Sequence, residues 1–384
     1  MPRERLVTAE KASKQQTRLH NRRLVLQHIA GATETSRADI ARATQLTPPT
    51  VSSLVRDLIE VGLVEERGRT DEASVGKPRQ MVAIAGSQYE IACVDLSRPI
   101  FRGVITDLDG TSQEIVARDA HGLVGKDAED AAAELVADLV ERMKAPERRI
   151  CLSTPGVVDD KGVVRRASYF GWTDVPLAAD MQARFGISTR VVNDSHALAF
   201  AEFAELANPV DNLVAVRVAR GVSAGIILHG TIYEGDGFGA GEIGFLLPTV
   251  AGDSAGKHRS ALSIGQLIEH LGGDSTAPGG WDLEGTVRQS TNHAVAALAS
   301  NIGEQLGHAL AAVVGVLDIH TVRIDQSVAC LGARLLDRAH ATLRGAVVDT
   351  TAAQLDIQFG SAGPNTVLRG AAIAATHHDL GLVS

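Results

Sequence analysis

The order of apolar and polar positions divides the chain into a helical beginning and a longer α/β remainder. Apolar residues recur at helical spacing in three early segments, residues 16–31, 37–43 and 49–61. Two strand-like runs follow and enclose a polar turn: residues 62–68, the turn at 70–77, and residues 81–84. Helices followed by a β-hairpin predict a winged helix–turn–helix domain over residues 1–85.

From residue 86 onward, short apolar runs alternate with helical segments, and the arrangement occurs twice. We expect strands at residues 91–96, 101–107, 114–117, 149–153, 191–194, 213–218, 225–228 and 320–324. We expect helices at residues 127–143, 195–206, 292–315 and 368–377. This order predicts an α/β body, residues 86–384, whose two similar lobes face a cleft. The lobes are placed at residues 86–195 together with the C-terminal helix, and at residues 196–365.

Charge is distributed unevenly between these two parts. Residues 1–85 carry 14 Lys and Arg against 10 Asp and Glu, whereas the remaining residues carry 23 against 36, within a net charge of −9. A basic domain on an acidic body favours a polyanionic partner for the first domain alone. A solvated basic tail is the alternative on charge alone.

Targeting signals and cysteine pairs are not recognisable in the sequence. No uninterrupted apolar run reaches about 18 residues, and the N-terminus has no apolar secretory segment. The three cysteines, Cys93, Cys151 and Cys330, are far apart and form no disulfide framework or CxxC-type metal site. We therefore expect a cytoplasmic protein with no membrane partner.

The third predicted helix of the head carries a face suited to double-stranded DNA. Its first turn is small and polar, and a basic residue follows, so that close approach to base edges and phosphates is possible. The hairpin adds an extended basic segment that fits a minor groove. The candidate DNA contacts are Thr47, Pro49, Thr50, Ser52, Ser53 and Arg56 on the helix, and Lys77, Pro78 and Arg79 on the wing. A three-helix scaffold that binds protein is the alternative.

Four motifs in the body carry a family resemblance. They are STPGVV, YFGW, VNDSHA and GAGEIG, at residues 153–158, 169–172, 192–197 and 239–244. In this order the body resembles the ROK family of bacterial repressors, open-reading-frame proteins and sugar kinases, which have the actin-like ATPase fold. A winged helix ahead of such a body is similar to the repressor branch, whose members respond to sugars or sugar derivatives.

The resemblance implies an effector site in the body. By family position, Asp194 corresponds to the base of the kinases, Asn193 and Glu242 to groups that bind sugar hydroxyls, and Gly171 and Trp172 to a substrate loop. Asn193 and Asp194 also suit the start of a helix, and the two roles are compatible. For Trp172, packing in the core is an equally good interpretation.

The segments that would hold ATP depart from the family pattern. The kinases begin with Asp-x-Gly-Gly-Thr, whereas this chain has Asp95 followed by Ser97 and Pro99, and proline has no N–H for a phosphate cradle. Arg220 replaces a threonine in the second phosphate turn, and residues 324–327 lack the expected glycines. We therefore expect no ATP cofactor, no catalytic residues and no kinase activity, although Asp194 would be the base of a kinase.

The family's zinc site is also not recognisable. Phe245 occupies the position of the ligating histidine, residues 246–262 contain no cysteine, and His258 is the only imidazole there. We expect no zinc and no other metal. Phe245 either stacks on a sugar or fills the space of the metal site.

The sequence thus predicts a sugar-responsive repressor that binds an inverted-repeat operator as a homodimer or homotetramer. Two alternatives remain open: a sugar kinase with a DNA-binding head, and a regulator without a small ligand.

Overall fold

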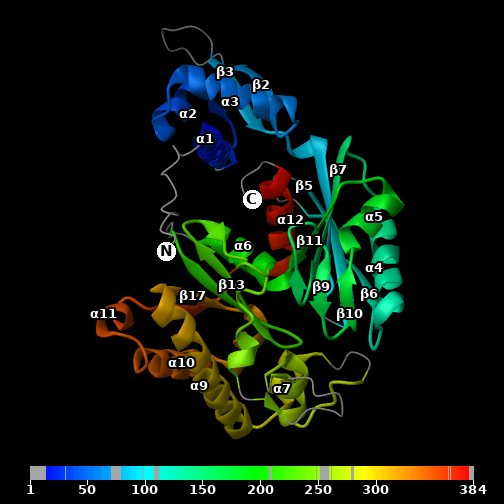
Figure 1. Cartoon of the computed structure of the whole chain (residues 1–384), viewed down its shortest axis with the longest axis vertical. Coiled ribbons are helices and arrows are strands. Elements are labelled where there is room, and N and C mark those ends of the chain that lie inside the picture. Colours follow the sequence, from blue (N-terminus) through cyan, green and yellow to red (C-terminus); the bar gives the residue numbers. More distant parts are fainter. Residues whose placement is uncertain are drawn as a thin grey trace, which may run out of the picture.

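A winged-helix head, residues 14–84, stands on a two-lobed body in the computed structural model (Figure 1). The structure describes residues 14–30, 32–70, 79–97, 99–107, 112–206, 210–247, 249–250, 259–260, 262–277, 281–361, 363 and 365–379. No helix in these ranges is long and apolar enough to span a membrane.

The head packs helices against a small antiparallel sheet of order β1-β3-β2. Its elements are α1 (Lys14–Ala30), β1 (Thr35–Ser36), α2 (Arg37–Thr44), α3 (Pro48–Glu60), β2 (Val64–Thr70) and β3 (Arg79–Ile84). Ile29, Ile40, Leu54 and Leu58 are buried where the three helices meet. The predicted winged helix–turn–helix order is confirmed.

Lobe I, residues 86–193, is built on a five-stranded sheet of order β11-β7-β4-β5-β6. Its elements are η1 (Gly86–Gln88), β4 (Tyr89–Asp95), β5 (Ile100–Asp107), β6 (Val116–Asp119), α4 (Gly125–Val140), β7 (Glu147–Thr154), β8 (Val157–Val158), β9 (Val164–Ala167), β10 (Trp172–Val175), α5 (Leu177–Phe185) and β11 (Thr189–Asn193). Strands β8, β9 and β10 form a separate antiparallel sheet.

Lobe II, residues 210–361, is built on a second five-stranded sheet, of order β14-β13-β12-β17-β18. Its elements are β12 (Leu213–Val218), β13 (Val222–Leu228), β14 (Thr231–Ile232), η2 (Ile243–Leu246), β15 (Thr249–Val250), β16 (Arg259–Ser260), α7 (Ile264–His270), α8 (Leu283–Gln289), α9 (Asn292–Leu317), β17 (Thr321–Ile324), η3 (Gln326–Leu331), α10 (Ala333–Arg344), α11 (Asp349–Ala352) and β18 (Asp356–Phe359).

The two sheets repeat one topology strand for strand. In lobe I, β4, β5 and β6 form an antiparallel meander, after which β7 pairs parallel to β4 and β11 parallel to β7. In lobe II, β12, β13 and β14 form the meander, after which β17 pairs parallel to β12 and β18 parallel to β17. In open α/β sheets, ligands bind at the carboxyl ends of the parallel strands. A ligand site is therefore expected at those ends.

Two helices cross between the lobes. Helix α6 (Asp194–Glu205) follows the last strand of lobe I but packs on β12 and β13 of lobe II. Helix α12 (Thr366–Asp379) follows the last strand of lobe II but packs on β4 and β7 of lobe I. The two helices contact each other closely, because a Cβ atom at Gly370 would lie 1.6 Å from the Ala197 carbonyl oxygen. This pair lies between the two sheets (Figure 1).

The head is joined to lobe I through a short, hydrogen-bonded connection. Strand β3 leads through η1 directly into β4, and the Ala85 N–H donates to the Leu63 carbonyl at 3.0 Å. Buried residues of the head, Tyr89 of β4 and the apolar faces of α6 and α12 belong to one hydrophobic cluster. The head is therefore joined to the body by packed side chains as well as by the chain itself.

Several elements differ from the expectation. The strand expected at residues 114–117 lies at Val116–Asp119, because pairing with β5 sets its register. Strands β8 to β10 and helices α5 and α10 were not predicted. The long helix expected at residues 292–315 is α9, which buries Ile302, Leu306 and Leu310 in the core of lobe II.

Candidate functional site

Helix α3 presents a polar N-terminal half on a helix that is buried on its other face. Val51, Leu54, Val55 and Leu58 are buried, whereas Thr47, Pro49 and Arg56 are exposed. Thr50, Ser52 and Ser53 are partly exposed. Thr47 caps the helix, since its hydroxyl accepts from the Thr50 N–H at 3.4 Å. The six helix residues predicted to contact DNA therefore lie on the N-terminal part of one accessible element.

Helix α2 ends in the sharp turn that sets α3 beside it. Ser36 caps α2, and its hydroxyl accepts from the Asp39 N–H at 3.2 Å. Gln45 terminates the helix in the left-handed region at φ 56°. Helix α1 also contacts α3, because Arg18 of α1 pairs with Asp57 of α3. These contacts hold α3 in a fixed orientation relative to the rest of the head.

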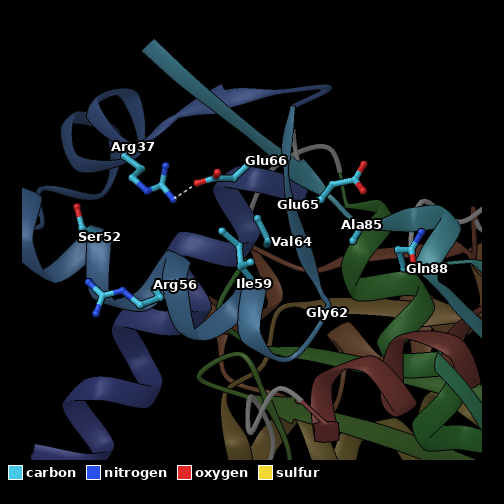
Figure 2. A pocket seen from close by; sticks show the side chains of 10 residues that line it. All are labelled: Arg37, Ser52, Arg56, Ile59, Gly62, Val64, Glu65, Glu66, Ala85 and Gln88. Carbon is cyan, nitrogen blue, oxygen red and sulfur yellow. Dashed lines mark hydrogen bonds and ion pairs between the residues drawn. The ribbon is translucent and has the colours of Figure 1, made fainter. Parts of the chain in front are cut away.

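The wing lies against α2 through an ion pair, which is visible in Figure 2. Arg37 Nη2 lies 2.7 Å from Glu66 Oε1, and Gln80 donates to the other Glu66 oxygen at 2.9 Å. A pocket extends beside this pair from α3 along β2 to η1, lined by Arg37, Ser52, Arg56, Ile59, Gly62, Val64, Glu65, Glu66, Ala85 and Gln88. Lys77 and Pro78 lie outside the described residues, as does the side chain of Arg79, so their DNA contacts stay predictions.

In the body, buried polar groups converge on one arginine, Arg217 of β12. Its Nη1 pairs with Asp325, its Nη2 donates to Ser97 Oγ at 2.7 Å, and its Nε lies 3.5 Å from Asp194 Oδ2. Asp95 is a further carboxylate whose charge acts on this guanidinium. We call Asp95, Ser97, Asp194, Arg217 and Asp325 the interlobe cluster. It joins residues at the carboxyl ends of β4, β11, β12 and β17, and its Arg217–Ser97 bond links lobe II to lobe I.

The carboxylates of the interlobe cluster differ in their protonation. Burial raises the pKa of Asp194 to about 6, against the opposing effect of the Arg217 charge. The pKa of Asp95 falls below its usual range: burial opposes ionisation, but the Arg217 and Arg102 charges and bonds from Ser97 outweigh it. Arg102 lies 3.3 Å from Asp95. Asp95 is therefore ionised at neutral pH, whereas Asp194 changes its protonation near pH 6.

Asn193 has the capping role that its position suggested. Its Oδ1 accepts from the Ser195 N–H at 2.8 Å and the His196 N–H at 3.2 Å at the start of α6. Its Nδ2 donates to the Gly156 carbonyl at 2.7 Å. The cap fixes Asp194, the first residue of the helix, at the boundary between the lobes. A contact of Asn193 with a ligand stays a prediction.

Glu242 is held beside this cluster by glycines. Gly241 has φ +85°, and a Cβ atom there would lie 1.8 Å from the Ala224 carbonyl oxygen of β13. At Gly244 a Cβ atom would lie 2.6 Å from the Val222 carbonyl oxygen. The chain around Glu242 is thus pressed against β13. Burial and then the negative charge of Asp194 raise the pKa of Glu242 to about 7, so the two carboxyl groups share one electrostatic environment.

The other three predicted effector residues lie in different surroundings. Trp172 is 2% exposed, stacks on Phe170 at 4.4 Å between ring centroids, and donates from Nε1 to the Gly125 carbonyl at 2.9 Å. Trp172 thus packs in the core, which is one of the two interpretations that its sequence position allowed. Phe245 is 69% exposed, which favours the alternative of contact with a sugar over packing in the space of a metal site, and that contact stays a prediction. Gly171 lies in the turn before β10 at φ +67° and has open space at its Cβ position.

The structure does not offer the family's zinc ligands. The phenyl ring of Phe245 stands at the position of the imidazole, and no cysteine follows it in residues 246–262. Within the described ranges, no group of three or more His, Cys, Asp or Glu side chains is placed to hold a metal ion. Residues 251–258, which include His258, lie outside those ranges. The expectation that no metal binds stays a prediction.

Sequence analysis did not identify Arg217 or its pairing with Asp325 as part of this site. The available signal was a charged residue inside the otherwise apolar strand at residues 213–218. A buried arginine in such a strand needs carboxylate partners, and only the fold shows which they are.

The duplicated sheets and the winged-helix head define a two-lobed protein of the actin-like ATPase fold with a DNA-binding-type domain. Residues 91–266 match the model of the ROK family, and residues 21–73 match that of the MarR family. The first match spans lobe I and the first part of lobe II, and the second lies within the head.

Relatives share part of their length with this chain. A xylose repressor of Bacillus spizizenii is 25% identical over 59% of this chain and 60% of its own length. The transcriptional dual regulator NagC of Escherichia coli is 29% identical over 55% and 53%. The chain thus spans less than two thirds of either relative. A solved ROK family transcriptional regulator, a homologue of the E. coli Mlc protein, has the same fold, with a TM-score of 0.76 and 18% identity over 95% of this chain and 98% of that one.

The raised pKa of Glu242 predicts how the free energy of unfolding depends on pH. Between pH 4.5 and about 7 the folded state retains a proton that the unfolded state releases, so this carboxyl lowers the free energy of unfolding as the pH rises through that window. Glu242→Gln should match wild type near pH 4.5 and exceed it by up to about 3 kcal/mol at pH 8 in urea unfolding. The exposed-carboxylate control Glu284→Gln should follow wild type. Parallel curves for E242Q and wild type would contradict the assignment.

Proposed function

We propose that this chain is a transcriptional repressor that binds operator DNA through its head and responds to a sugar or sugar derivative through its body. The observation that carries the proposal is the accessible face of α3, where Thr47 at the N-cap, Pro49 in the first turn and Arg56 beyond the midpoint are exposed while the other face is buried. A helix in that position enters the major groove. The names of the relatives, a xylose repressor and a DNA-binding regulator, support the same function.

The operator is proposed to be an inverted repeat that two or four copies of the chain recognise. One winged-helix head reads a half-site, and a two-fold protein matches a two-fold site. Because such a repressor acts on the chromosome of the cell, we propose that it works in the cytoplasm.

The sugar is proposed to bind beside Asn193, Asp194 and Glu242 and to alter the relation of the two lobes. Hydroxyl groups suit the two carboxyl groups there, whose raised pKa values let each act as donor or acceptor near neutral pH. A ligand shifts such an equilibrium only by its difference in affinity between the two states. The connection from β4 through η1 to β3 then carries the shift of lobe I to the head.

The body is proposed to lack kinase activity. Arg217, paired with Asp325, lies at the strand ends where the resemblance places the phosphates of the family's kinases, and its Nε lies 3.5 Å from Asp194, the residue that would act as base. Pro99 and Ser97 replace residues of the first phosphate cradle.

Operator binding tests the function directly. With DNA from upstream of the chain's own gene, Arg56→Ala should weaken retardation about ten-fold or more and reduce its salt dependence, because an arginine–DNA contact is lost. Arg288→Ala removes an equally exposed arginine of α8 and should bind like wild type. Specific binding by wild type that R56A leaves unchanged would remove α3 from the interface.

The effector site is tested by the same assay with a panel of pentoses, hexoses and amino-hexoses. Asp194→Ala should abolish release from the operator while keeping operator affinity within about two-fold, because the head is remote from the interlobe cluster. Asp194→Asn, which keeps the size of the side chain, controls for loss of packing. Unchanged release by D194A would refute the assignment, and a wild type that no sugar releases would favour a ligand-independent regulator.

Kinase activity is tested by incubation with ATP and the same sugars. We expect wild type to form no more ADP than the D194A variant. Sugar-dependent ADP formation that D194A abolishes would instead establish a kinase with a DNA-binding head.

A further inference from the structure

Arg220 has a buried cation with no hydrogen-bonding partner, in contrast to its neighbour Arg217. Its Nε, Nη1 and Nη2 are all buried, and none has a hydrogen-bond partner in the described part of the chain. Among the buried guanidinium groups described there, Arg220 alone lacks partners for all three nitrogens. A guanidinium group carries five N–H donors, and buried donors are satisfied in nearly all native structures, by protein, water or a bound ion. The described residues therefore leave these donors to an acceptor from water, from the rest of the chain or from a ligand.

The surroundings of Arg220 are aromatic. Its Cζ lies 3.1 Å from the centroid of the Tyr169 ring, 5.4 Å from that of Phe170 and 5.5 Å from that of Trp281. Stacking on rings occupies the face of the guanidinium group, so its in-plane N–H edge is the part that suits a planar, two-point contact. Aromatic rings attract the cation but cannot accept its in-plane hydrogen bonds. The rings thus orient the group without satisfying it.

The position of Arg220 is between the lobes. It lies in the turn that joins β12 to β13 of lobe II, whereas Tyr169 and Phe170 lie in the turn between β9 and β10 of lobe I. Both turns have open space next to them, since a Cβ atom at Gly221 or at Gly171 would meet no atom within 4 Å. Each turn is therefore open on the side of its glycine.

The carboxylate charge nearby is already compensated. Asp95 is the carboxylate whose charge favours the protonated form of Arg220, but it is bonded by Ser97 and paired with Arg102. Burial nevertheless lowers the pKa of Arg220 to about 9, which leaves it a cation at neutral pH. Arg217, in contrast, is matched by Asp194 and Asp325. Of these two interlobe arginines, Arg220 is therefore the one whose positive charge is not balanced by a paired carboxylate among the described residues.

We infer that Arg220 binds an oxyanion carried by the effector, so that the natural ligand is a phosphorylated or acidic sugar and not a neutral one. This inference rests on the effector-binding function proposed above. Phosphate and carboxylate both match the edge of a guanidinium group through two parallel hydrogen bonds. The sugar hydroxyls would lie toward Asp194 and Glu242, and the anionic group toward Arg220 and the turn at Gly221.

The test is calorimetric titration of the full-length protein without DNA, at constant ionic strength set by chloride. The probes are inorganic phosphate, acetate, and the set glucose, glucose 6-phosphate and glucuronate. We expect wild type to bind at least one oxyanion, and Arg220→Gln to weaken that binding about ten-fold or more, since the charge-assisted contact is lost. Arg220→Lys should recover part of the affinity, because it keeps the charge but not the planar edge. Preference for phosphate or for acetate identifies the kind of anionic group.

The matched control is Arg184→Gln, which removes an exposed arginine that also stacks on a ring, that of Phe185 at 5.6 Å. It should bind anions as wild type does. Equal anion affinity in R220Q and wild type, or no anion binding by wild type, would overturn the inference. A fall in melting temperature of R220Q with unchanged anion binding would assign Arg220 a packing role only.

The two proposals fail separately. If the protein retains no operator DNA but R220Q still weakens anion binding, the regulatory function is wrong and the anion site stands. If a neutral sugar releases wild type and R220Q from the operator equally, the repressor function stands and the anion site is wrong.

Discussion

The joining of the two lobes depends on one buried cation, Arg217, and the carboxylates around it. Moving these charges out of water costs several kcal/mol for each ion, and the cost is recovered only while the groups stay together. Asp325 comes from the same lobe, but Ser97 is supplied by lobe I and Asp194 by the helix that crosses between the lobes. Loss of the arginine would leave several acidic groups buried without compensation. The relative placement of the lobes is therefore set by charge at their meeting point as well as by apolar packing.

The duplicated topology explains why these charges meet. Each lobe runs a meander and then two parallel strands, so the carboxyl ends of β4, β7 and β11 face those of β12, β17 and β18 across the crossing helices. The topology therefore brings together polar residues from different segments of the chain, Asp95, Asn193 and Asp325. Glycines make this convergence possible: Gly370 lets α12 approach α6, and Gly225 lets α6 approach β13, where a Cβ atom would lie 2.3 Å from the Ser195 carbonyl oxygen. The site is thus a product of the repeat.

Local signals in the sequence predicted the parts that local chemistry determines. Asn193 caps α6 and the apolar faces of the head helices are buried, because both features depend on neighbours a few residues away. Arg217 shows where such prediction ends. The apolar run around it indicates a buried position, but its partners Ser97 and Asp325 lie more than a hundred residues away in sequence. The stacking of Arg220 on Tyr169 likewise follows from how the lobes assemble and has no signature in spacing.

The contrast between the two interlobe arginines bears on how a ligand would change this protein. Arg217 already has its carboxylates, so an incoming anion would gain little there and would compete with Asp194 and Asp325. Arg220 holds a charge that the described chain does not match, and burial of an unmatched charge raises the free energy of the state that buries it. An anion at Arg220 stabilises that state in particular, and only such a difference between states gives a ligand control over a conformation. Strand β4 of lobe I is connected through η1 to β3 of the wing. Under the function proposed above, a ligand that changes the relative placement of the lobes would therefore also change the position of α3.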